Sequence, residues 1–191
     1  MPKLWNSTIE AHRQAVRQAI LEATWSLVSE HGLLAVTMSR VAEEAGVGRA
    51  TLYKYFPDVE SILAAWHERH TAEHLAQLTQ LGERDGDPID RLRAVLDGYA
   101  RIVRQRGTHA SELTNLLHKG EAVRQTQHQL VALVRDVLTA AVDSGAVRDD
   151  VPPGELASYC IHALATASAL PSRAAVARLV DVTLDGVRPR T

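Results

Sequence analysis

Apolar residues recur every three or four positions along most of this 191-residue chain, which is the spacing of one face of an α-helix. Glycine, proline and short polar turns, such as GERDGD at residues 82–87, separate the apolar stretches. No stretch shows the alternation of apolar and polar residues that predicts a half-buried strand. The pattern therefore predicts an all-α protein of about nine helices.

Two of the predicted helices are short and lie together at residues 37–56, TMSRVAEEAGVGRATLYKYF. Thr37 can accept hydrogen bonds from the first-turn amides of a helix over residues 38–45. Gly46 follows where a helix end favours a left-handed residue, and a second helix is predicted over residues 49–55. Two short helices joined by such a corner have the spacing of a helix-turn-helix.

The second short helix is predicted to have one packed face and one free face. At about 100° per residue, Leu52, Tyr55 and Phe56 fall together, whereas Ala50 and Lys54 point the other way. Small residues, hydroxyls and cations suit a helix in the major groove of DNA, where phosphates and base edges are the targets. The periodicity alone leaves both DNA binding and an ordinary helical corner open.

Longer helices are predicted on both sides of this pair. Ser7 and Glu10 have capping-box spacing and start a first helix that ends at Gly32, after a frayed tail. A long helix without internal glycine or proline runs from Val59 to about Gln80 and has the form of a strut between domains. Further helices are predicted over residues 88–107, 108–118, 121–143 and 153–170, and a last one ends before Pro189.

The order of residues over 20–63 resembles the tetracycline-repressor-like (TetR) family of transcriptional regulators. The resemblance rests on Gly32, Thr37, Val41, Ala42, Ala45, Gly46, Val47, Thr51, Leu52, Tyr53, Tyr55, Phe56 and Leu63. It implies a helix-turn-helix DNA-binding domain at residues 1–57 and a helical effector-binding and dimerisation domain at residues 58–191. It also implies a homodimeric repressor that a small molecule releases from a palindromic double-stranded operator. Gly48, Ala50 and Val59 depart from the usual serine, glycine and lysine of the family.

The candidate DNA contacts lie on the two short helices and near the start of the first helix. Net charge is −2, and residues 1–57 hold six Lys/Arg against five Asp/Glu, so affinity must come from the placement of cations. The resemblance implies that Tyr53 contacts a phosphate, whereas solvated surface arginines are an equal interpretation of Arg13 and Arg17. The full set is Arg13, Arg17, Thr37, Arg40, Gly48, Arg49, Ala50, Thr51, Tyr53 and Lys54.

The resemblance places a pocket for an unknown small-molecule effector between the long helix and the helices that follow it. The candidate lining residues are Trp66, His70, Tyr99, Leu117, His118 and His128. The two C-terminal helices have wide apolar faces, which suit a four-helix interface with a second copy. The candidate dimer contacts are Leu156, Cys160, Leu164, Val176, Leu179, Val180 and Leu184.

Histidines give one alternative, a metal-responsive regulator. His70 and His74 are four apart, the spacing of a helical half-site, and His67 lies near them on the same helix. No cysteine or acid stands at a helpful spacing, so we expect no metal and no cofactor. Neighbouring helices could still complete the site through His109, His118 or His128.

A helical enzyme or binding protein without DNA binding is the other alternative. The sequence has no glycine-rich phosphate loop, no nucleophile elbow and no HExxH motif, so no catalytic residue is predicted. The single cysteine, Cys160, excludes an internal disulfide framework. A membrane-spanning helix needs about 20 consecutive apolar residues, and no apolar run in the sequence approaches that length. We therefore expect a cytoplasmic protein that does not contact a membrane.

Overall fold

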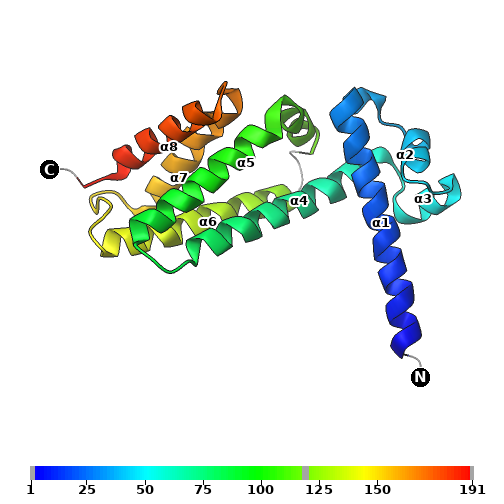
Figure 1. Cartoon of the computed structure of the whole chain (residues 1–191), viewed down its shortest axis with the longest axis horizontal. Coiled ribbons are helices and arrows are strands. Elements are labelled where there is room, and N and C mark those ends of the chain that lie inside the picture. The colour runs from blue at the N-terminus through cyan, green and yellow to red at the C-terminus, as the bar shows by residue number, and fades with distance from the viewer. Residues whose placement is uncertain (1–2, 118–120, 190–191) are drawn as a thin grey trace. The chain divides into compact units, whose positions relative to one another are not determined.

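The computed structural model describes the backbone of residues 3–117 and 121–189 and the side chains of residues 8–105 and 124–189. Within these ranges every regular element is helical, with eight α-helices and two short 3-10 helices (Figure 1). The all-α prediction is confirmed, and the helix count is close to the predicted nine. The chain divides into two compact units, residues 1–70 and 71–191.

Unit 1 is built around the first helix. α1 (Lys3–His31) contacts the 3-10 helix η1 (Leu33–Ala35) and α2 (Met38–Glu44), and α2 contacts α3 (Arg49–Tyr55). The first part of α4 (Val59–Gly82) completes the unit. One fully buried residue from each α-helix forms the centre of its core, namely Ile20, Val41, Leu52 and Ile62.

Local capping explains where the helices of unit 1 begin. The Thr37 hydroxyl accepts from the Arg40 amide at 3.3 Å, as predicted for the start of α2. At the start of α4, the Asp58 carboxylate accepts from the Ser61 amide at 2.7 Å, and the Ser61 hydroxyl accepts from the Asp58 amide at 3.4 Å. This reciprocal pair is a capping box, and it fixes the corner after α3.

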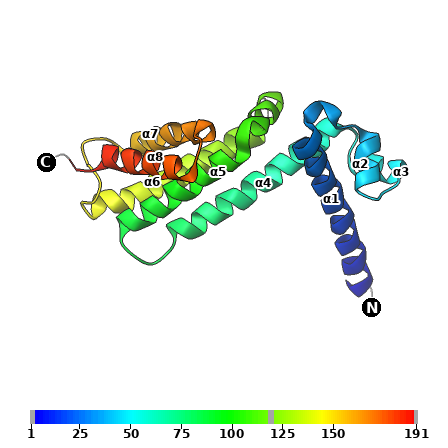
Figure 2. The same cartoon turned by 45° about the horizontal axis from the view of Figure 1, so that its top comes forward.

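Unit 2 is organised around α5 (Pro88–Leu117), which contacts every helix that follows it. Figures 1 and 2 both show α7 (Pro153–Ala165) and α8 (Arg173–Val187) side by side along α5. α6 (Glu121–Asp143) packs on α5 and α7, and η2 (Thr166–Ala169) lies against α5. The core is aliphatic and includes the fully buried Leu92, Leu96, Leu138 and Leu164.

The second half of α4 approaches its neighbours in unit 2 closely. A Cβ atom added to Gly98 of α5 would lie 2.9 Å from the terminal carbons of both Leu78 and Leu81 of α4. A Cβ atom at Gly82 would lie 3.0 Å from Val137 of α6. A side chain at Gly98 would displace the two leucine ends, and one at Gly82 would displace the valine by a few tenths of an ångström, so both glycines favour close packing of α4 on its neighbours.

Three predicted helix ends were wrong. α1 begins at Lys3, so Ser7 lies inside the helix and is not its N-cap. α5 continues through Gly107 to Leu117, where two helices were predicted, because one glycine costs a helix only about 1 kcal/mol. The helix predicted over residues 153–170 ends as an α-helix at Ala165 and tightens into η2.

None of the helices in the described part of the chain combines the length and the apolar character that crossing a membrane requires.

Candidate nucleic-acid interface

The exposed face of α3 is the centre of the candidate site. Leu52 is fully buried and Phe56 is 4% exposed, so these two side chains attach the helix to unit 1. Tyr53 is 55% exposed, and Arg49, Ala50 and Lys54 are exposed with it. Thr51 is half-buried at the edge of this face. The division into packed and free residues agrees with the periodicity of the sequence.

The corner before α3 holds this face in place through its backbone. Gly46 has φ 64°, and nothing lies within 4 Å of where its Cβ would be, so conformation and not space demands glycine there. The amide of Val47 donates to the Ala42 carbonyl at 2.9 Å, which closes the end of α2. Gly48 caps α3 in extended conformation without a side chain and is itself exposed.

Two of the arginines predicted as DNA contacts interact within unit 1. The guanidinium carbon of Arg17 lies 4.8 Å from the centre of the Phe56 ring, which is a cation–π geometry between α1 and the end of α3. Arg40 donates from Nη1 to the Ala35 carbonyl at 3.1 Å and so ties α2 to η1. Arg13 is exposed on α1, and Thr37, the N-cap residue of α2, is also exposed. Arg17 and Arg40 therefore stabilise the arrangement of the short helices, whatever else they contact.

The candidate effector residues fall into separate groups. Trp66 and His70 lie in unit 1, where Trp66 stacks on Trp25 of α1 with 3.9 Å between ring centres and 9° between ring planes. The His70 ring stacks on the Trp66 ring with 4.7 Å between their centres. Trp25 stands 41 residues before Trp66 in the sequence, and no local pattern signals this stack.

The other effector candidates belong to unit 2 or lie outside the described residues. Tyr99 on α5 is half-buried against the unit 2 core, and His128 on α6 is exposed. The side chain of Leu117 and the whole of His118 lie outside the described part of the chain.

The candidate dimer residues are mostly buried within their own unit. Leu179 is partly buried, and the other six are at most 5% exposed in the core of unit 2: Leu156, Cys160, Leu164, Val176, Val180 and Leu184. The large exposed apolar side chains of the same two helices are instead Tyr159, which is 45% exposed, and Val182, which is 65% exposed. A Cβ atom at Gly186 would lie 2.6 Å from the Tyr159 hydroxyl, so the phenol crosses from α7 over α8 at this glycine.

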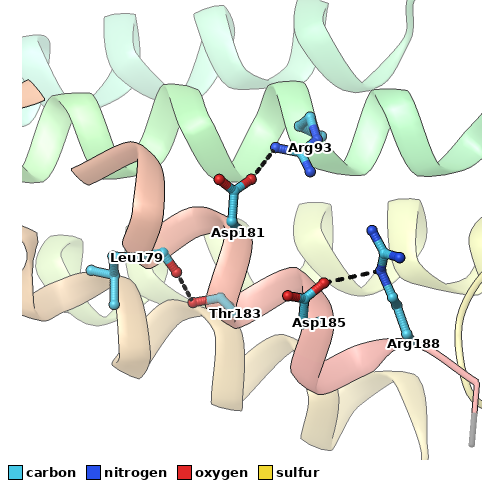
Figure 3. A network of polar contacts seen from close by, with 6 residues as sticks. All are labelled: Arg93, Leu179, Asp181, Thr183, Asp185 and Arg188. Atoms are coloured by element: carbon cyan, nitrogen blue, oxygen red, sulfur yellow. Dashed lines mark hydrogen bonds and ion pairs between the residues drawn. The ribbon is translucent and has the colours of Figure 1, made fainter. Parts of the chain in front are cut away.

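Polar contacts occupy a neighbouring side of α8 (Figure 3). Asp181 points to Arg93 of α5, with 2.6 Å between Oδ1 and Nη1, and Asp185 accepts from Arg188 Nε at 3.1 Å. The Thr183 hydroxyl donates back to the Leu179 carbonyl at 2.8 Å. Exposed ion pairs such as Arg93–Asp181 contribute about 0–1 kcal/mol, so the aliphatic core holds α8 on α5.

Among the residues with described side chains, no group of three or more His, Cys, Asp or Glu is placed to hold a metal ion. Burial raises the pKa of the Cys160 thiol from 9.0 to about 12, so this cysteine is a protonated core residue at neutral pH.

A capped short helix, a left-handed glycine corner and a second helix with an exposed, cationic face together define a helix-turn-helix DNA-binding protein. Comparison with known proteins agrees with this class. Residues 20–66 match the family described as bacterial regulatory proteins, tetR family. Residues 92–189 match the family described as transcriptional regulator SbtR-like, C-terminal domain.

Relatives and solved structures extend the agreement over most of the chain. The HTH-type transcriptional regulator TtgR of Pseudomonas putida is 30% identical over 156 residues, which cover 75% of this chain and 71% of TtgR. A TetR/AcrR-family regulator from Thermobifida fusca superimposes with a TM-score of 0.77 at 19% identity, over 90% of this chain and 98% of that one. FadR of Bacillus subtilis in complex with stearoyl-CoA superimposes with a TM-score of 0.71 at 14% identity, over 90% of this chain and 99% of the FadR chain.

This chain therefore belongs to the TetR family of transcriptional regulators, in which ligand-responsive repression is typical. The resemblance noted in the sequence is confirmed.

Proposed function

We propose that the protein is a homodimeric repressor that binds a palindromic operator through two copies of α3 and releases it when a small molecule binds. The observation that carries this proposal is the joint exposure of Arg49, Ala50, Tyr53 and Lys54 on a helix whose opposite face is buried. The regulator has no enzymatic role in this proposal, and it acts in the cytoplasm, where its DNA lies.

We assign DNA binding to residues 1–57 and the dimer and effector functions to residues 58–191. In this assignment Tyr53 fixes α3 against a phosphate and Lys54, central on the exposed face, contacts base edges. Two recognition helices fit one face of a duplex when they are about 34 Å apart or a multiple of it. An effector that changes this separation would release both half-sites together. The remaining proposed contacts are Arg13, Thr37, Gly48, Arg49, Ala50 and Thr51.

We place the dimer interface on the exposed side of α7 and α8, around Tyr159, Val182 and Gly186. Val182 and Gly186 are one turn apart on α8, and Tyr159 covers the glycine, so these residues form a continuous exposed strip. A charge at the buried Leu164 would unfold the protomer, whereas a charge at Val182 would meet only the partner. Val182→Asp should therefore give a folded monomer in light scattering, and Leu34→Asp, at a fully exposed position of η1, should stay dimeric.

We propose that the effector is a small organic molecule that contacts unit 2, with Tyr99 as the candidate residue on α5. This proposal is supported by the solved FadR structure of the same fold, which holds stearoyl-CoA. Tyr99→Phe should alter release by the effector while DNA affinity without the effector is nearly unchanged. Equal release from parent and variant would remove Tyr99 from the site.

A binding-site selection with the purified protein tests the central proposal. We expect enrichment of a palindromic motif whose binding weakens steeply with salt, because phosphate contacts release counterions. A library of small molecules can then be screened for compounds that release the selected operator. Failure to enrich any motif at low salt, with a dimeric and folded protein, would overturn the proposed function.

A further inference from the structure

The stack of Trp25, Trp66 and His70 joins α1 to the first part of α4 inside unit 1. The two indole rings are nearly parallel, at 9° with 3.9 Å between their centres, and the imidazole continues the stack at 22° and 4.7 Å. All three side chains are half-buried. Trp66 is therefore stacked on two rings at once, one from α1 and one from its own helix.

The stack lies on the same side of α4 as the residue that anchors the beginning of the helix. Ile62, Trp66 and His70 are four positions apart, so they form one stripe along α4. Ile62 is fully buried in the unit 1 core, and the capping box of Asp58 and Ser61 fixes the first turn. The helix is thus held on unit 1 at its start by the core and two turns later by the rings.

Flat rings constrain a helix more than aliphatic contacts do. Aliphatic side chains can re-pack when a helix tilts, whereas stacked rings lose contact when their planes separate or turn. α4 is a single helix without internal glycine or proline, so its first part, from Val59 to His70 in unit 1, has no flexible break. The ring stack therefore fixes the direction of this part of α4 relative to α1.

We propose that Trp25, Trp66 and His70 are positioning residues for operator recognition, which set the half-site spacing that the dimer accepts. This inference rests on the proposed dimeric operator binding and adds to it the residues that hold each DNA-binding unit on its α4. It assigns Trp66 and His70 a role other than the effector contact predicted from the sequence, because their rings are already stacked on each other.

The test uses the full-length protein and its selected operator, together with operators carrying one or two extra base pairs at the centre. Each inserted base pair moves a half-site by about 3.4 Å and turns it by about 35°. The measured quantity is the ratio of affinities for the natural and the lengthened operators. In Trp66→Leu, which removes both aromatic pairs, this ratio should fall about 25-fold, a factor of about five for each pair.

Further variants separate positioning from simple destabilisation. Trp25→Leu, which removes one aromatic pair, should lower the ratio about fivefold, and Trp66→Phe should restore most of the preference. The double variant should add little to Trp66→Leu, because the same pair is lost in both. Val41→Ala, a core truncation in α2, should weaken unit 1 without changing the ratio. His70→Ala removes only the outer ring and keeps the test open if the leucine variants do not fold; it should lower the ratio by a smaller factor.

The outcomes separate this inference from the proposed function. A parent protein that selects no operator overturns both. The other outcome starts from a parent that prefers one operator spacing. If the variants lose the near-ultraviolet circular dichroism signal of stacked indoles but keep the parent's ratio of affinities, only the positioning role is overturned. An unchanged ratio in folded His70→Ala has the same meaning where the leucine variants do not fold.

Discussion

The contact between Arg17 and Phe56 allows two roles of one arginine to be separated. Arg17 was predicted as a phosphate contact, yet its guanidinium lies 4.8 Å from the centre of the Phe56 ring. Phe56 is 4% exposed and caps the end of α3, so the ring is held firmly beneath the cation. We expect Arg17 to act mainly by fixing the recognition helix against α1.

The size of the effect follows from the partial burial of the pair. Cation–π contacts range from about 0.5 kcal/mol at exposed sites to about 2 kcal/mol when desolvated, and Arg17 is half-buried. Arg17→Met keeps an aliphatic stem over the ring and removes the charge, so unit 1 should lose about 1 kcal/mol of unfolding free energy. Arg17→Lys keeps the charge but not the planar group, so it should recover only part of this loss.

Arg13 supplies the matched control, because it stands one turn earlier on α1 and is exposed. Arg13→Met should change the unfolding free energy by less than about 0.5 kcal/mol. If Arg13 meets a phosphate, its removal from both protomers should reduce the slope of log affinity against log salt by about 2. Arg17→Met should leave that slope unchanged while operator affinity falls severalfold.

Urea unfolding followed by tryptophan fluorescence measures the stability, since Trp25 and Trp66 both lie in unit 1. Operator binding at four or five salt concentrations gives the slope. The reasoning would be refuted by an Arg17→Met protein that is as stable as the parent and has a reduced salt slope. That combination would show that the guanidinium contacts phosphate and contributes nothing to the packing of α3.

Other substitutions test the remaining contacts. Lys54→Ala should cost about 1 to 3 kcal/mol at particular base pairs and relax the selected motif there; an unchanged motif with uniformly lower affinity would make Lys54 a phosphate contact. Gly98→Ala should lose the gain of about 1 kcal/mol in unfolding free energy that alanine gives in a helix, because its Cβ meets two leucine ends at 2.9 Å, whereas Gly154→Ala, in open space, should keep it. Cys160, whose pKa is raised to about 12, should resist thiol reagents at pH 8 in the folded protein. Above about pH 9 the unfolded chain loses the thiol proton that the folded state keeps, so the free energy of unfolding should decline as pH rises. Urea unfolding at several pH values should show a steeper decline in the parent than in Cys160→Ala.

The sequence predicted the helix-turn-helix well because its signals are local. Thr37 caps the helix that follows it, and Gly46 adopts the left-handed conformation that was expected. Each of these depends on residues within a few positions along the chain. The separation of Leu52 from Lys54 on opposite faces follows from helical geometry alone.

The contacts between distant residues could not be predicted in the same way. Periodicity shows that Leu164 and Leu184 lie on apolar faces, but a core within the same chain covers those faces as well as a second copy would. The stack of Trp25 on Trp66 joins two helices whose relative rotation no local pattern determines. The cost of Gly107 to a helix is visible in the sequence, yet α5 continues through it to Leu117.

The Lys and Arg residues of the proposed DNA-binding residues 1–57 differ in whether they are engaged within the protein, and this difference gives an expected salt dependence. Among those whose side chains the structure describes, Arg17 and Arg40 are engaged with Phe56 and Ala35, whereas Arg13, Arg49 and Lys54 are exposed and make no polar or ring contact. With Lys54 assigned to base edges, Arg13 and Arg49 in each protomer of a dimer would neutralise about four phosphates, which corresponds to a slope of about −4 for log affinity against log salt. If Arg17 and Arg40 also met phosphates, the count would rise to about eight and the slope to about −7. A measured slope near −7 would show that these two arginines exchange their contacts within the protein for contacts with DNA. A slope near −4 would mean that they hold α2 and α3 in place while Arg13 and Arg49 supply the charge.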